Sequence, residues 1–283
     1  MTDPVRDATP PAPGAIPHAA PPAAPAAPGA DSRAAPDAAR RPHPVLPGYY
    51  ARDEDRAGFV RDLFDRTAAD YDRLNRVFSF GTGGRYRREA LLRAGLRPGA
   101  RVLDVAVGTG LVAREAVGIT GRASDVTGVD VSRGMLEHAR AACGIELIQA
   151  RAEALPVRDA GVDMVTMGYA LRHVADLLDA FREYHRVLRP GGSVLLLEIG
   201  RPRGRWAHGV ARFYLGRVIP VLCRLALSGR DASTLMGYHW DTIESCVPPE
   251  AILDGLREAG FVGVECEVVL GIFRAYRARR PGG

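Results

Sequence analysis

The sequence contains no lysine: all 38 basic residues among its 283 residues are arginine. This absence excludes Schiff-base chemistry and lysine nucleophiles. It also means that any site for a carboxylate or another anion must use guanidinium groups, which bind oxygen atoms in a bidentate fork. A base-composition bias of the genome is enough to explain the preference, so the arginines by themselves indicate no function.

Cysteine is scarce, and its four residues form no CxxC pair. This spacing argues against a zinc knuckle or a disulfide framework and fits a reducing compartment. No apolar run reaches the roughly 18 residues that a membrane span needs, and no apolar signal-peptide core follows the opening MTDPVRD. These absences predict a cytoplasmic protein.

Charge of either sign is not in large excess, since the formal net charge is +5 and the pI is near 9.3. So modest a charge does not predict nucleic-acid binding, and we expect no nucleic-acid partner. An acidic substrate or an anionic membrane surface is equally compatible with it. The composition, with 47% hydrophobic and 25% charged residues, is ordinary for a globular protein.

Composition divides the chain near residue 46. Residues 1–46 are mostly alanine and proline, which bury too little apolar surface to offset the entropy of ordering. We therefore predict a disordered tail over 1–46 and one domain over 47–283. Apolar residues then recur at helical spacing over 53–80, which we expect to form a helical lid, and over 84–96.

From residue 101 onward, strand-like runs alternate with amphipathic helical stretches. Repeated strand–helix units predict an α/β fold with an open, mostly parallel, twisted sheet and helices on both faces. The runs 261–270 and 271–278 read as two closing strands, so we expect an antiparallel strand at the C-terminal end. A further helical insertion is predicted at about 203–245.

The stretch VLDVAVGTG, residues 102–110, leads from a strand into a glycine turn of the kind that binds nucleotides. Gly108, Gly110 and Ala113 satisfy a loose G-x-G-x-x-A pattern, which alone is weak support for a dinucleotide site. Asp104 opposes that interpretation, because a carboxylate at the strand end repels a pyrophosphate and suits a cationic ligand. Asp130, at the end of the next predicted strand, can accept both hydroxyl groups of a ribose.

Later segments carry a family resemblance. The pieces ADYDRLNRVFSFG, VLDVAVGTG, AEALPVRDAGVDMVT, ALRHV and RVLRPGG follow one another in order. In these pieces the chain from Phe59 to Gly263 resembles the ubiquinone/menaquinone biosynthesis C-methyltransferase family, a class I methyltransferase family. The resemblance implies a Rossmann-like fold, S-adenosyl-L-methionine as the methyl donor, and C-methylation of a prenylated quinol or a related electron-rich ring.

The resemblance also implies which residues bind the donor. Gly108 and Gly110 let the backbone approach the methionine moiety, Asp130 holds the ribose, and the pair Arg151 and Ala152 reads the adenine. The complete predicted set is Asp104, Ala106, Gly108, Thr109, Gly110, Asp130, Val131, Met135, Arg151, Ala152, Glu153 and Gly168.

The sequence departs from the family pattern at several of these positions. Arg151 stands where an asparagine or aspartate usually accepts a hydrogen bond from the adenine amine, and arginine has donors only. Arg151 can stack on the ring instead, or Glu153 can take the accepting role. Val107 replaces a glycine, Gly168 replaces a serine, and His173 replaces an asparagine.

Ring methylation needs the acceptor as a phenolate, with a base and a positive group for the oxyanion, and it needs no metal. Arg172 follows a strand end, where open parallel sheets bind ligands, and is the candidate for the acceptor oxygen. His173 has a pKa range suited to a base. Tyr71 and Asp72 are expected to order the lid. Each also has an ordinary structural alternative as a capping, surface or helix-internal residue.

The segment 203–229 interleaves apolar residues at near-helical spacing with arginines. A basic amphipathic helix can lie on an anionic membrane, which suits a prenylated, lipophilic acceptor and a membrane-peripheral location. The alternatives are a helix that covers the active site and one that packs at a homodimer interface.

Other functions remain open from the sequence alone. A specialised enzyme of the same fold would methylate an oxygen, nitrogen or carbon atom of a secondary metabolite. A nicotinamide oxidoreductase rests only on the stretch GTGLVA, and a non-enzymatic adaptor at a lipid surface rests only on the basic segment.

Overall fold

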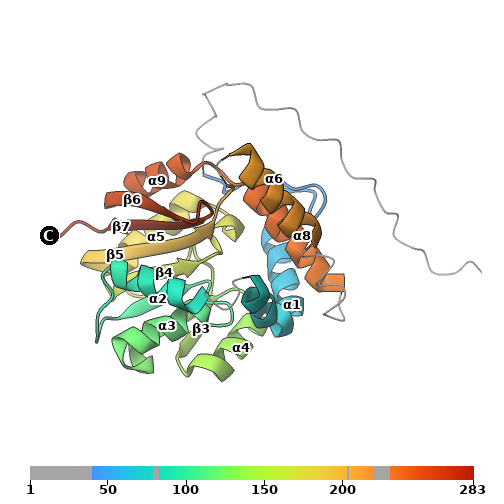
Figure 1. Ribbon diagram of the computed structural model, residues 1–283. Helices are drawn as coiled ribbons and strands as arrows, with labels where there is room; N and C mark the ends of the chain where they lie inside the picture. The colour runs from blue at the N-terminus through green and yellow to red at the C-terminus, as the bar shows by residue number, and fades with distance from the viewer. Residues whose placement is uncertain (1–39, 79–82, 203, 219–229) are drawn as a thin grey trace, which may run out of the picture. The chain divides into compact units, whose positions relative to one another are not determined.

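A computed structural model describes residues 40–78, 83–202, 204–218 and 230–283, and the structural statements below concern these ranges. A seven-stranded sheet runs through them in the order β3-β2-β1-β4-β5-β7-β6 (Figure 1). Strands β1 to β5 are parallel, and β7 is antiparallel to both of its neighbours. The strands are β1 (Val102–Val105), β2 (Val126–Asp130), β3 (Glu146–Gln149), β4 (Val162–Gly168), β5 (Leu188–Ile199), β6 (Val262–Val269) and β7 (Phe273–Arg279). The predicted α/β fold is confirmed.

Helices cover both faces of the sheet because successive strand residues point to opposite sides. Val102 and Met164 belong to a core cluster with α2, α3 and α4, whereas their neighbours Leu103 and Val165 belong to a second cluster with α5 and α9. The two apolar faces explain why the central strands read as continuous apolar runs. These helices are α2 (Gly83–Arg93), α3 (Leu111–Thr120), α4 (Arg133–Cys143), α5 (Leu177–Val187) and α9 (Pro249–Glu258).

A third group of helices lies at the end of the sheet where the parallel strands finish. It comprises α1 (Arg56–Phe78), α6 (Arg205–Phe213), the π-helical turn η4 (Tyr214–Val218) and α8 (Arg230–Ser245). Although far apart in sequence, α1 (blue) and α8 (orange) pack side by side in Figure 1, with Leu63 and Tyr238 fully buried in a small cluster. Asp65 ties α1 to the start of α4, since one of its oxygens accepts from the Gly134 N–H at 2.9 Å.

The ordered domain begins before the boundary that the sequence suggests. Residues 1–39 lie outside the described ranges, but residues 40–46, which the sequence also assigned to the tail, pack on the domain. The Arg40 carbonyl accepts from the Leu177 N–H at 2.7 Å, and the Pro42 carbonyl accepts from the Val247 N–H at 2.9 Å. His43 is buried. Residues 40–42 therefore link the start of α5 to the loop between α8 and α9, a contact that their proline-rich surroundings in the sequence did not indicate.

The predicted insertion at 203–245 is helical in its described parts, α6, η4 and α8, and residues 203 and 219–229 lie outside them. Within the described ranges, no helix is both long enough and apolar enough to cross a membrane.

Candidate active site

The turn after β1 has the backbone shape of a ligand cradle. Ala106 and Gly108 have φ angles of 53° and 55°, and Gly110, at the start of α3, has a φ of 85°. A side chain on Gly110 would be strained by this angle and would overlap the Cys143 sulfur. Glycine is therefore required where α3 approaches α4.

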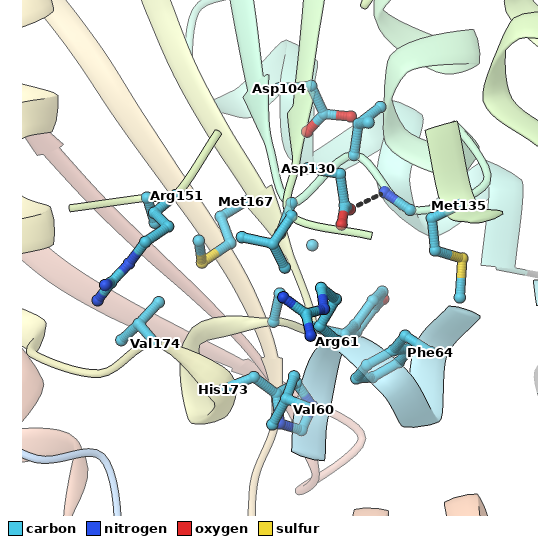
Figure 2. A pocket seen from close by; sticks show the side chains of 18 of the residues that line it. Val60, Arg61, Phe64, Asp104, Asp130, Met135, Arg151, Met167, His173 and Val174 are labelled. Atoms are coloured by element: carbon cyan, nitrogen blue, oxygen red, sulfur yellow. Dashed lines mark hydrogen bonds between the residues drawn. The ribbon is translucent and has the colours of Figure 1, made fainter. Parts of the chain in front are cut away.

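This turn forms one wall of a cavity of about 460 Å³ at the carboxyl ends of β1, β2 and β4. Figure 2 shows Asp104 and Asp130 on one side of it and Val60, Phe64 and His173 on the opposite side. The sequence-predicted residues that line it are Tyr71, Asp104, Ala106, Gly108, Thr109, Asp130, Val131, Met135, Arg151, Ala152, Glu153, Gly168 and His173. Asp72, Gly110 and Arg172 do not line it.

Asp104 is a buried acid with one unused oxygen. Its Oδ1 accepts from the Thr166 hydroxyl at 2.7 Å, whereas its Oδ2 has no partner among the described residues. Burial raises the pKa of Asp104 to about 7, although the Thr166 hydrogen bond acts in the opposite direction. An unpartnered acid facing a cavity suits a cationic group of a ligand.

Asp130 organises the turn and faces the same cavity. Its Oδ2 accepts from the Gly108 N–H at 2.8 Å, and its Oδ1 accepts from the Ser132 N–H at 2.9 Å. Burial raises its pKa to about 6. Each oxygen keeps a second lone pair, so the carboxylate can still accept two hydroxyl groups.

The adenine end that the sequence predicts is formed by the segment after β3. Arg151 pairs with Glu153, with 3.4 Å between Nε and Oε2, and its side chain is more than half exposed. Glu153 Oε1 accepts from the Ala175 N–H at 2.6 Å. The carboxylate of Glu153 is therefore fixed in orientation, while Arg151 stays free to cover a ring.

His173 lies fully buried in the cavity wall. Neither of its ring nitrogens has a partner among the described residues. Burial, with the nearby Arg172 charge, holds its pKa well below 6.5. The ring is surrounded by those of Phe64, Tyr238 and His239, with centroids 5.2 to 5.6 Å away. His173 is thus neutral at pH 7 and can accept a hydrogen bond from a ligand.

The segment expected to act as a lid touches the glycine turn directly. The Thr109 hydroxyl donates to Asp72 Oδ1 at 2.5 Å. Tyr71 lines the cavity one residue earlier, with its ring 6.0 Å from that of Phe64. Asp72 therefore joins α1 to the turn, and Tyr71 lines the cavity.

Arg172 lies outside the cavity and has partners at all three guanidinium nitrogens. Nε donates to Glu198 at 2.9 Å, Nη1 to the Thr242 hydroxyl at 2.8 Å, and Nη2 to the Tyr169 carbonyl at 3.4 Å. Arg172 and Glu198 are 1% and 3% exposed. This geometry favours a structural role that joins β4, β5 and α8, and the predicted contact with an acceptor oxygen stays a hypothesis.

With the geometry described, comparison with known proteins identifies the family. Residues 51–278 match the ubiE/COQ5 methyltransferase family. The chain belongs to this family. It is similar to the demethylmenaquinone methyltransferase of Symbiobacterium thermophilum, with 33% identity over 80% of this chain and 94% of that protein. It also matches the ubiquinone/menaquinone biosynthesis C-methyltransferase UbiE of Shewanella woodyi, with 34% identity over 79% and 91%.

This family member is an S-adenosylmethionine-dependent methyltransferase, as the resemblance implied. Its fold is that of solved methyltransferases. A putative methyltransferase of Haloferax volcanii aligns with a TM-score of 0.56 at 18% identity, over 79% of this chain and 98% of that one. Phosphoethanolamine N-methyltransferase 2 of Haemonchus contortus aligns with a TM-score of 0.54 at 18% identity, over 78% and 60%.

The cavity of this methyltransferase fits the donor. The unpartnered oxygen of Asp104 is a suitable contact for the donor's α-ammonium group, and Asp130 is suitably placed for the ribose. Glycine at position 168 preserves the shape of the cavity wall. A Cβ there would lie 2.7 Å from Val112, which also lines the cavity, and would displace it. The alternative of a nicotinamide oxidoreductase gains no support from these features.

Donor affinity should depend on pH through Asp104. Burial holds the pKa of Asp104 at about 7, above that of an aspartate in the unfolded chain, so its contribution to stability is fully present at low pH and is lost as the pH rises through about 7. A cationic donor prefers the ionised acid. We therefore expect the affinity for S-adenosylhomocysteine, measured by isothermal titration, to rise roughly tenfold from about pH 6 to about pH 8.

The control is Asp104→Asn, which keeps the size of the side chain but cannot ionise. Its affinity should be lower and nearly constant over the same range. If the affinity for S-adenosylhomocysteine rose equally with pH in both proteins, Asp104 would have no role in this pH dependence.

Several cavity residues were not predicted from the sequence. Phe64, Arg87, Gln149 and Tyr169 also line it. Gln149 could have been found, since it ends β3 beside the end of β2. Arg87 and Phe64 come from helices whose placement over the sheet no local pattern encodes.

Proposed function

We propose that this methyltransferase methylates a ring carbon of a lipophilic quinol, because its relatives are a demethylmenaquinone methyltransferase and a ubiquinone/menaquinone biosynthesis C-methyltransferase. The observation that carries the proposal is the cavity itself, where two acids and a glycine turn face an aromatic and apolar wall. The acids suit a cationic donor, and the apolar wall suits a lipophilic ring. When bound, the donor supplies a methyl group on a sulfonium, which an electron-rich carbon can attack.

The proposed donor contacts follow the cavity from one end to the other. Asp104 pairs with the ammonium group, Asp130 accepts the ribose hydroxyls, and Glu153 with the Ala152 backbone holds the adenine. Arg151 covers the adenine ring. The remaining predicted contacts, Ala106, Gly108, Thr109, Val131, Met135 and Gly168, provide backbone and shape, and Gly110 maintains the turn.

On the acceptor side, His173 is proposed to accept the hydrogen bond of the ring hydroxyl. Burial keeps it neutral, and the surrounding aromatic rings fix its orientation. Tyr71 covers the acceptor from α1, and Asp72 holds that segment against the glycine turn. Arg172 is proposed to act on the acceptor indirectly. Its bonds to the His239 carbonyl and to Glu198 fix the segment that carries His173.

The test uses the full chain with S-adenosylmethionine and a reduced demethylmenaquinol, and mass spectrometry of the product. We expect a gain of one methyl group, located on a ring carbon by fragmentation. The alternative is a specialised enzyme with another small-molecule acceptor. S-adenosylhomocysteine binding without methylation of any quinol would favour that alternative, and methylation on oxygen would contradict the proposed chemistry.

We further propose that the enzyme is cytoplasmic and that it meets its acceptor at a membrane surface through α6. Trp206, Val210 and Phe213 recur at helical spacing and are all exposed, and Trp206 is 88% exposed. Arg212 and Arg217 are also exposed nearby. Apolar side chains flanked by arginines suit the boundary of an anionic bilayer.

Sedimentation with vesicles tests this contact. The double variant Trp206→Ala/Phe213→Ala should bind anionic vesicles about tenfold more weakly than the unchanged protein. Leu92→Ala, which removes another exposed apolar side chain on α2, is the control. If the double variant binds vesicles normally but changes from dimer to monomer in solution, the surface is a homodimer interface instead.

A further inference from the structure

A second cavity, of about 480 Å³, adjoins the donor cavity and has no role in the account above. Its walls come from α2, α8 and the turn between β6 and β7. Most of its lining is apolar, and it includes Leu235, Met236, Trp240, Ile243, Leu270 and Phe273. Leu270 is 84% exposed, so an apolar side chain stands in solvent on the rim.

The two cavities share three residues, Tyr71, Arg87 and Tyr169. Tyr169 follows the end of β4 with a φ of 63°, an uncommon conformation for a tyrosine. The Arg87 guanidinium lies over the Tyr169 ring, with 5.7 Å between its Cζ and the ring centroid. Any molecule that spans both cavities must therefore pass this arginine and its tyrosine neighbours.

Arg87 differs from the other arginines around the second cavity. Arg85 and Arg93 pair with Glu89, and Arg172 pairs with Glu198. Arg87 is only 6% exposed, its Nε has no hydrogen-bond partner among the described residues, and its guanidinium contacts the Tyr169 ring and no described carboxylate within ion-pair distance. An aromatic ring compensates a buried guanidinium only in part, so this group is suited to an oxygen ligand with negative charge.

We propose that the second cavity holds the apolar substituent of the acceptor and that Arg87 binds the acceptor's ring oxygen at the junction of the two cavities. This inference rests on the proposed quinol methylation. The ring then lies between Tyr71 and Tyr169, with one face toward the donor. The substituent extends past α8 toward Leu270.

In the proposed methyl transfer, Arg87 is the group that holds the oxyanion. The ring hydroxyl loses its proton to solvent through His173, and Arg87 stabilises the phenolate that results. The ring carbon beside it forms a bond to the methyl group as the methyl–sulfur bond breaks, and that electron pair stays on sulfur. The same carbon then releases its hydrogen as a proton to solvent, which restores the aromatic ring as a phenolate, and this oxygen takes up a proton when the product leaves.

The first experiment replaces Arg87 with methionine and uses Arg88→Met as the control, because Arg88 is exposed and lines neither cavity. We expect kcat/KM for the quinol to fall about 100-fold for Arg87→Met and to stay near normal for the control. The affinity for S-adenosylhomocysteine should change less than threefold. Arg87→Lys keeps the charge and should recover part of the activity if the methionine variant folds poorly.

A spectroscopic readout separates oxygen binding from a structural role. Bound 4-nitro-1-naphthol should be held as its coloured phenolate by the unchanged protein and by Arg88→Met, but less so by Arg87→Met. A tenfold loss of S-adenosylhomocysteine affinity in Arg87→Met, with an unchanged naphthol spectrum, would place Arg87 on the donor and overturn the proposal. An unchanged protein that methylates no quinol would instead defeat the proposed function.

The second experiment tests the apolar cavity by acceptor length. Leu270→Glu places a charge at the rim, and Ile243→Phe fills space inside. Both should raise KM about tenfold for a quinol with a long prenyl chain and leave KM and kcat for a chain-free naphthoquinol unchanged. Val268→Glu, on an exposed residue outside the cavity, is the control. Equal effects on both acceptors, or none on either, would contradict the assignment.

Discussion

Replacing Arg172 with methionine is expected to lower the free energy of unfolding by about 3–5 kcal/mol, the usual cost of removing one partner of a buried ion pair. Glu198 would keep its charge in a site that is 3% exposed. It would retain only the N–H donors of Leu171 and Ile199. For a domain of this size the melting temperature should fall by about 10 °C.

The matched comparison is the double variant Arg172→Met/Glu198→Gln, which removes both charges. Because no isolated charge then stays buried, its melting temperature should lie above that of Arg172→Met alone. Thermal unfolding of the unchanged protein, of Arg172→Met, of Glu198→Gln and of the double variant gives the coupling between the two residues. If Arg172→Met melts normally yet loses quinol methylation, Arg172 contacts the acceptor directly, and the structural role proposed for it is wrong.

The second large effect is expected at Asp130, where asparagine should weaken S-adenosylhomocysteine binding about 100-fold, or roughly 3 kcal/mol. The carboxylate accepts from two backbone N–H groups, those of Gly108 and Ser132. An asparagine amide can accept only one of these hydrogen bonds, and its NH₂ group opposes the other donor. The turn would shift, and one ribose hydroxyl would lose its acceptor.

Isothermal titration measures this effect, and Asp125→Asn provides the control. Asp125 precedes β2 at the opposite edge of the sheet and pairs with Arg122 at 3.1 Å. Its replacement should leave donor affinity unchanged. A dissociation constant for Asp130→Asn within threefold of the normal value would remove Asp130 from the donor site.

That the two acids and the glycine turn line one cavity could be predicted because their determinants are local. Asp104 lies within β1, and Asp130 ends the neighbouring strand β2. Parallel strands bring their carboxyl ends to one edge, so a carboxylate there is placed by strand order alone. The glycine pattern adds the turn, since the backbone shape at Gly110 excludes a side chain.

The acceptor side could not be predicted in the same way. Arg172 follows a strand end and was expected to face a ligand, but its partners Glu198 and Thr242 come from β5 and α8. Arg87 looked like one of many helix arginines, and only its burial at the junction of the two cavities singles it out. Which arginine is paired depends on contacts between distant elements.

The sequence by itself determined the sheet, the family and the placing of two acids at one cavity, because alternating strands and helices and a glycine turn are patterns within short stretches. Only the tertiary structure decided which cations stay unpaired, where a second cavity opens, and that residues from Arg40 onward join the domain. The physical reason is that burial and ion pairing depend on neighbours from the whole chain, whereas strand periodicity and turn geometry depend on adjacent residues.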